Sequence, residues 1–130
     1  MSVVSLGFPP RNELRIAATL EGRELSLSLA GTADMRVSDD LASLLTRVHA
    51  EAIACGATSV TVDMTQLEFM NSSCFKGFVS WVSKLQSLEA GQRYLIVLKS
   101  NASLRWQKRS LAALVYFAPE SVRVEPVQGC

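Results

Sequence analysis

The chain of 130 residues is long enough for one compact domain, since single domains commonly contain roughly 100–150 residues. Hydrophobic residues make up 48% of it and charged residues 19%, which excludes an intrinsically disordered chain. The formal net charge of +1 excludes a global electrostatic attraction to nucleic acid or to an anionic membrane.

The cysteines and the N-terminal residues indicate the compartment. Cys55, Cys74 and Cys130 are widely spaced and include no Cys-x-x-Cys pair, so we expect neither a disulfide framework nor a zinc site. Residues 1–12 lack the basic start and long apolar run of a signal peptide, and about 18 consecutive apolar residues occur nowhere in the chain. These features predict a protein of the reducing cytoplasm.

Two strands joined by a tight turn are predicted first. Apolar residues alternate with polar ones from Leu14 to Leu20, and the alternation resumes from Leu25 to Leu29 after the turn residues Glu21-Gly22-Arg23. A helical period then runs from Leu41 to Ile53. Ser38 and Asp39 are its N-cap candidates and Gly56 is its stop signal.

The middle of the chain reads as a strand, a loop and a second helix. Ser59 to Met64 is a β-branched run typical of a strand, and we expect Gln66 to Met70 to form a loop after it. From Ser73 the helical period returns and ends before Gly91. The residues expected on the apolar face of this helix are Phe75, Phe78, Val79, Val82 and Leu85.

The last third predicts a strand, a helix and a final strand. Tyr94 to Leu98 is apolar throughout, as in a central strand that is covered on both faces. A third helix is expected over Ala102–Val115, with Leu104, Leu111, Leu114 and Val115 facing inward, and a short strand over Val122–Val124.

The predicted order β-β-α-β-α-β-α-β belongs to the α/β class. It implies a mixed, mostly parallel β-sheet flanked by crossover helices. We expect an irregular segment over residues 1–12, a single domain over residues 13–125 and a tail over residues 126–130.

The segment from Val60 to Phe75 resembles the core signature of STAS domains, the family that includes anti-sigma factor antagonists. In that signature an apolar strand ends in an Asp-aliphatic pair, and Asp-Ser-Ser-Gly-Leu opens a helix after a loop. Here Asp63-Met64 and Asn71-Ser72-Ser73-Cys74-Phe75 stand at the matching positions, and Gly31-Thr32-Ala33-Asp34 is similar to the family's Gly-x-x-Asp loop. The predicted strand order is also that of the family.

The resemblance implies a phosphorylated serine and a regulatory partner. In anti-sigma factor antagonists the second serine of the motif, here Ser73, is phosphorylated by a kinase that is also the anti-sigma factor. A second group of bacterial regulators has Asn-Thr-Ser-Ser followed by lysine, which Asn71 and Lys76 also match, and there Ser72 would be the phosphoacceptor. We prefer Ser73. The alternative without phosphorylation is that both serines are N-cap residues of the helix.

Two residues depart from the antagonist pattern. Asn71 replaces an aspartate, which removes a negative charge beside the phosphorylation site, and Cys74 replaces a glycine, which adds a side chain where a partner's backbone would approach. A cysteine at a helix N-terminus could also have a lowered pKa, although we favour a role as a small residue. The predicted partner-binding residues are Asp34, Asn71, Cys74, Phe75, Lys76 and Trp81.

Three further features have ordinary structural explanations. Arg105, Lys108 and Arg109 with Trp106 could contact phosphates, but a solvated helix face is the better interpretation. His49, the single histidine, is interpreted as a surface residue. Trp81 lies off the apolar stripe of its helix, so it is either an exposed interface anchor or packed against the third helix. No catalytic, metal-binding or cofactor-binding motif occurs in the sequence.

We therefore predict a non-catalytic partner-switching module that binds a serine-kinase anti-sigma factor or another kinase and phosphatase pair. The alternative is a constitutive STAS-type subunit of a larger complex, such as a transporter or a signalling scaffold. A nucleotide-binding domain or an enzyme is a third hypothesis for which the sequence offers no dedicated site.

Overall fold

Six strands lie side by side in chain order in the computed structural model, which describes residues 2–3 and 14–127. The first three strands pair antiparallel, and the last four, from β3 onward, pair parallel. The strands are β1 (Ser2–Val3), β2 (Leu14–Glu21), β3 (Glu24–Ala33), β4 (Ser59–Met70), β5 (Leu95–Asn101) and β6 (Val122–Val127). The predicted mixed, mostly parallel sheet is therefore confirmed.

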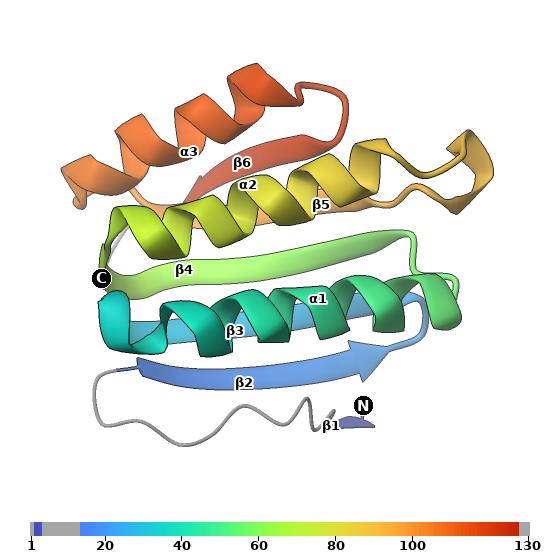
Figure 1. Ribbon diagram of the computed structural model, residues 1–130, viewed down its shortest axis with the longest axis horizontal. Coiled ribbons are helices and arrows are strands. Elements are labelled where there is room, and N and C mark those ends of the chain that lie inside the picture. Colours follow the sequence, from blue (N-terminus) through green and yellow to red (C-terminus); the bar gives the residue numbers. More distant parts are fainter. Residues whose placement is uncertain (1, 4–13, 128–130) are drawn as a thin grey trace.

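Three helices connect the parallel strands and lie together in front of the sheet (Figure 1). They are α1 (Ser38–Ala54), α2 (Ser72–Gln86) and α3 (Arg105–Phe117). Because each crossover is right-handed and moves to the next strand in the same direction, all three helices fall on one face. Leu25, Leu27 and Leu29 of β3 are buried under them, whereas Glu24 and Ser28 on the opposite face are exposed.

The apolar strand β5 is interior, as predicted, because it pairs with β4 on one side and β6 on the other. Ile96 and Leu98 are buried. The helices cover only one of the two faces of this strand, although residues on both faces are buried as expected. Val97, on the opposite face, is buried between its register neighbours Thr61 and Arg123.

Strand β4 is twice as long as its β-branched run suggested. The segment Gln66 to Met70, predicted as a loop, continues the strand and pairs with β3. Two register shifts against β3 break the alternation, so that the buried residues Leu67 and Met70 are three positions apart instead of two. Strands are recognised in a sequence from the alternation of apolar and polar residues. A bulge interrupts this alternation, so the second half of β4 is not recognised as a strand.

A buried glutamine compensates for the bulge. Pairing between β4 and β5 stops at Asp63, so carbonyl groups beyond it on the β5 side have no partner in that strand. Nε2 of Gln107, which is fully buried on α3, donates to the carbonyl oxygens of Met64 (2.6 Å) and Leu67 (3.0 Å). Its Oε1 accepts from the backbone N–H of Asn101 at 2.8 Å. Gln107 therefore fastens α3 to two strands.

The ends of the elements differ from the predictions for local reasons. A 3-10 turn, η1 (Met35–Val37), precedes α1, so neither Ser38 nor Asp39 is the N-cap; Val37 holds that position without a side-chain bond. Gly56 ends α1 as predicted, with a positive φ of 65°.

The last helix and strand are also shifted. Helix α3 starts at Arg105 and not at Ala102, because the Asn101 side chain accepts from the N–H of Ser103 at 2.8 Å in a turn. Strand β6 runs to Val127, into the predicted tail, because its residues continue to pair with β5. Strand β1 lies within the segment predicted to be irregular, whose residues 4–12 are outside the described part. Within the described part, no helix is long and apolar enough to span a membrane.

Candidate functional site

The predicted site residues Asp34 and Asn71 meet at the carboxyl ends of β3 and β4. Ala33 and Met70 are paired in the sheet, and the N–H of Asn71 donates to the carbonyl oxygen of Ala33 at 2.9 Å. The turn η1 and the helix α2 therefore start next to each other, at the left end of the molecule in Figure 1. The structure thus brings the Gly-x-x-Asp loop and the serine motif together.

Asn71 is the N-cap of α2. Its backbone is extended (φ −79°, ψ 171°), and its side-chain oxygen accepts from the N–H of Cys74 at 3.0 Å. An amide oxygen and a carboxylate oxygen both make this bond, so the cap persists although asparagine stands in the aspartate position. The interpretation of Ser72 and Ser73 as N-cap residues is wrong.

The two serines occupy the first two positions of α2. Ser72 is exposed and Ser73 is half-buried. Neither hydroxyl group bonds to any residue of the described segments. The first N–H groups of a helix have no intrahelical acceptor, and with the N–H of Cys74 capped, those of Ser72 and Ser73 face outward with the positive end of the helix dipole. This arrangement can accommodate a negative group.

Cys74 is buried and cannot contact a partner directly, contrary to the prediction. Its side chain is 1% exposed, and Sγ donates to the backbone oxygen of Asp34 at 3.3 Å. Burial, together with the negative charge of Asp34, raises the pKa of this thiol to about 11. The alternative of a reactive thiolate is therefore also wrong. Cys74 instead joins the turn at Asp34 to the start of α2.

Asp34 forms an ion pair at the edge of this site. Its carboxylate accepts from the Arg36 guanidinium (2.8 Å from Nη2 to Oδ2) and from the Arg36 backbone N–H at 2.9 Å. These hydrogen bonds with Arg36 lower the pKa of the Asp34 carboxyl group. The side chain is partly exposed and remains charged, so it presents one fixed polar group beside α2.

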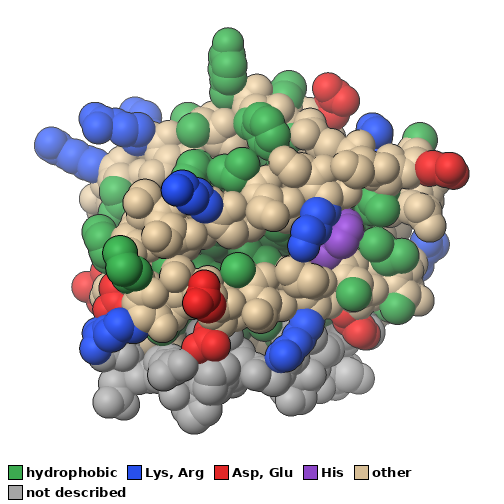
Figure 2. Space-filling view, in the orientation of Figure 1, with side chains coloured by type: hydrophobic (Ala, Val, Ile, Leu, Met, Phe, Trp, Pro, Cys, Tyr) green, Lys and Arg blue, Asp and Glu red, His purple; other side chains and the backbone are tan. Residues whose placement is uncertain are grey.

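Two large apolar side chains that come close to the start of α2 along the chain or in the sheet are exposed to solvent. Met35 on η1 is 70% exposed, and Phe69, opposite Thr32 near the end of β4, is 48% exposed. We refer to Met35, Phe69, Ser72 and Ser73 as the α2-start surface. Figure 2 shows hydrophobic side chains among charged ones at the end where α1 and α2 begin. Neither Met35 nor Phe69 was predicted, since only their exposure distinguishes them from core residues.

Two further predicted partner-binding residues follow the serines on α2. Phe75 is half-buried and packs against the core, while Lys76 is exposed on the first turn of α2. Both lie within four residues of the serines, so a partner that covers the start of α2 would lie close to them. Lys76 is the more accessible of the two.

Comparison with known proteins identifies the fold. The chain matches no family model and no curated protein. Among solved structures six chains match, one of which is an anti-sigma factor antagonist from Mycobacterium paratuberculosis. The two chains are 13% identical, with a TM-score of 0.62 over 88% of this chain and 87% of the other. This chain has the fold of an anti-sigma factor antagonist.

Within this antagonist fold Trp81 is a core residue. It is 2% exposed, and its indole N–H donates to the hydroxyl oxygen of Tyr94 at 2.7 Å. The prediction of an exposed anchor is therefore wrong. Trp81 lies off the expected stripe because α2 packs against α1 as well as the sheet, which widens the buried face of the helix.

His49 continues this buried chain of hydrogen bonds and is not a free surface residue. Its Nδ1 lies 2.7 Å from the Tyr94 hydroxyl oxygen. Because that oxygen accepts the indole proton of Trp81, its own proton is available to Nδ1 when the imidazole is neutral. Burial raises the pKa of Tyr94 to about 12, so the tyrosine remains a donor.

We expect the protein to lose stability when the pH falls from about 7.5 to about 5.5. Burial, and secondarily the charge of Lys84, lower the pKa of His49 below its usual value of 6.5. The unfolded chain therefore binds more protons in this range, and the free energy of unfolding decreases as the pH falls. Thermal melting at a series of pH values measures this effect. His49→Gln retains an acceptor for Tyr94 and should give a flatter profile; an equally steep one would contradict the assignment.

The basic cluster on α3 is a solvated face, as expected. Arg105, Lys108 and Arg109 are exposed, whereas Trp106 is half-buried and packs against the core. Its indole N–H is buried without an acceptor among residues 14–127. The ring is thus not available for stacking on a nucleic acid base. No group of three or more His, Cys, Asp or Glu side chains in the described ranges could hold a metal ion.

Proposed function

We propose that this protein is a non-catalytic partner-switching module of the bacterial cytoplasm. The α2-start surface binds a regulatory protein, and phosphorylation of Ser73 or Ser72 releases it. The observation that carries this proposal is the presence of two unbonded serine hydroxyl groups at a helix N-terminus, with the exposed Met35 and Phe69 on the segments that precede it. The anti-sigma factor antagonist with the same fold supports a partner of the anti-sigma type.

The geometry favours a switch that alters binding and not folding. A phosphate adds a charge of about −1.5 to −2 at a position where the helix dipole and free N–H groups stabilise it. The same charge would be desolvated if a partner covered Met35 and Phe69, and burial of an unpaired charge is costly. Phosphorylation therefore separates the partner from an intact domain.

The two serines have different advantages as the phosphoacceptor. Ser73 matches the phosphorylated position of the antagonist motif, whereas Ser72 is more exposed to a kinase. We retain Ser73 as the preferred residue. The partner is a serine-kinase anti-sigma factor, or another kinase and phosphatase pair.

Replacing both Met35 and Phe69 with serine should weaken partner binding by about 10–100-fold, because exposed apolar side chains at the centre of an interface contribute most to affinity. The partner is captured from a lysate of the source cell, identified by mass spectrometry, produced and titrated by calorimetry. Its ability to phosphorylate the peptide around Ser72 and Ser73 is measured with ATP.

Tyr116→Ser is the matched control, since Tyr116 is 91% exposed on α3, outside this surface. It should leave the affinity unchanged, and both variants should melt like the natural protein. A captured partner that binds the double variant with full affinity would contradict the assigned surface. A partner that binds tightly but never phosphorylates either serine would favour the constitutive subunit of a larger complex.

A further inference from the structure

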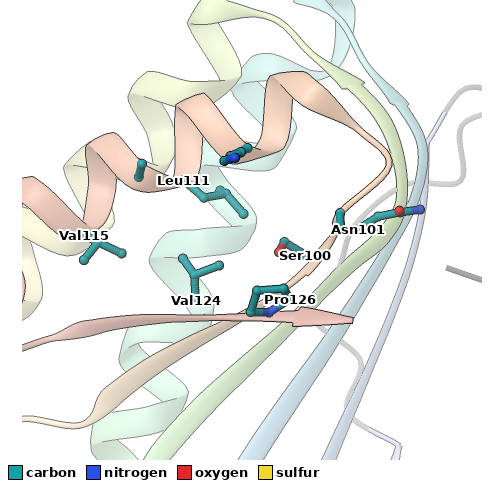
Figure 3. A pocket seen from close by; sticks show the side chains of 9 residues that line it. Ser100, Asn101, Leu111, Val115, Val124 and Pro126 are labelled. Atoms are coloured by element: carbon teal, nitrogen blue, oxygen red, sulfur yellow. The ribbon is translucent and has the colours of Figure 1, made fainter. Parts of the chain in front are cut away.

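A cavity of about 510 Å³ lies between α3 and the last two strands, and it shares no residue with the α2-start surface. Its volume is in the range of small-molecule sites, and it is open to solvent on one side. The lining residues are Ser100, Asn101, Ala102, Lys108, Leu111, Ala112, Val115, Val124 and Pro126. Figure 3 shows α3 on one side of this cavity and β6 on the other.

One end of the cavity is polar. Ser100 is 6% exposed and lines the cavity, yet its hydroxyl group has no hydrogen-bond partner in the described part of the chain. Its oxygen is not among the buried unsatisfied atoms of the described residues, so the hydroxyl group is reached by solvent at the cavity and is free to donate to a ligand there. Asn101 lies at the same end, but its side chain already donates to Thr65 and accepts from Ser103.

Lys108 supplies the only charge among the residues that line the cavity. It is exposed on α3 and forms no ion pair with a described residue. It lies one helical turn before Leu111, in the first half of α3, and it lines the cavity together with Ser100 and Asn101. A donor hydroxyl and an ammonium group thus line the same cavity, a combination that suits an anion with a single charge.

The other end is aliphatic. Leu111 and Val115 of α3 face Val124 of β6 across the cavity (Figure 3). Val115 lies about two helical turns beyond Lys108, or about 10 Å along the helix, which is the length of an extended chain of about eight carbons. These walls offer no hydrogen-bond donor, so a nucleotide or a phosphate dianion would leave most of its acceptors unpaired.

We propose that this cavity binds an aliphatic monocarboxylate. Its carboxylate accepts hydrogen bonds from the Ser100 hydroxyl group and the Lys108 ammonium group, and its hydrocarbon chain lies along Leu111, Val115 and Val124. The carboxylate gives the Ser100 hydroxyl the acceptor that it lacks. The aliphatic chain covers the apolar walls that are open to solvent in the free protein.

Calorimetric titration with octanoate tests this site on the whole protein. We expect saturable binding of one molecule, with chemical-shift changes at the methyl groups of Leu111, Val115 and Val124. Lys108→Met should weaken binding by about tenfold, because a hydrogen bond to a charged group is lost. Ser100→Ala should also weaken it. Arg109→Met, an exposed cation that does not line the cavity, should bind like the natural protein.

Three control ligands distinguish the contribution of the carboxylate to binding from that of the hydrocarbon chain. Acetate has the carboxylate alone, octanol has the chain alone, and octylamine reverses the charge; each should bind at least about tenfold more weakly than octanoate. Absence of saturable octanoate binding, or equal binding of octanoate and octylamine, would overturn the proposal. Equal binding to Lys108→Met and the natural protein would overturn the assignment of the head group. None of these outcomes depends on the α2-start surface.

Discussion

Replacing Gln107 with methionine is expected to lower the free energy of unfolding by about 3–5 kcal/mol, because three backbone groups lose their partner at once. The carbonyl groups of Met64 and Leu67 and the N–H of Asn101 would remain buried behind a thioether that neither donates nor accepts well. For a domain of this size the melting temperature should fall by about 10–15 °C.

Lys108→Met is the matched control for this variant. It introduces the same side chain at the next position of the same helix, but on the exposed face, so its melting temperature should stay within about 2 °C of the natural value. Hydrogen exchange at the amide of Asn101 provides a local readout and should accelerate only in Gln107→Met. If Gln107→Met melts like the control, the bulge of β4 is held by other contacts.

Replacing Ser73 with aspartate is expected to weaken partner binding by at least about 100-fold while changing the free energy of unfolding by no more than about 1 kcal/mol. A carboxylate at the second position of α2 is stabilised by the helix dipole, whereas a partner that covers it must desolvate an unpaired charge. Thermal melting measures the stability, and titration with the captured partner measures the affinity.

Ser73→Ala and the same pair of variants at Ser72 complete the experiment. The alanine variants should bind normally and resist phosphorylation at the position they replace, which identifies the phosphoacceptor. Unfolding of Ser73→Asp would show that this half-buried position does not tolerate charge. The exposed Ser72 would then be assigned as the phosphoacceptor. If both aspartate variants bind with full affinity, the module is a constitutive subunit.

The element order could be predicted because periodicity is a local property of the sequence. The strand Leu95–Asn101 and the helix Ser72–Gln86 carry their own apolar patterns, so the sheet, its interior strand and the crossovers follow from a few residues at a time. The most specific part of the resemblance to the antagonist family likewise lies within one stretch of chain, from Asp63 to Phe75. The fold that it implied is confirmed.

The bulged half of β4 could not be predicted, since its burial pattern is set by a neighbouring strand. Leu67 and Met70 are three positions apart, which does not fit the period of two of a regular strand, and the register shifts against β3 explain their burial on one face. Gln107 is a similar case. A glutamine on a helix is usually exposed, and its burial depends on carbonyl groups about 40 positions earlier in the chain.

The sequence by itself thus determined which elements form and where the serine motif lies, because both are encoded in neighbouring residues. Only the tertiary structure decided which side chains of the motif are accessible. Cys74 and Trp81 are packed in the core and bonded to Asp34 and Tyr94, whereas Met35 and Phe69 remain exposed. The exposure of a side chain depends on which distant segments of the chain pack over it. The hydrophobicity of the side chain sets only how much free energy its burial would gain.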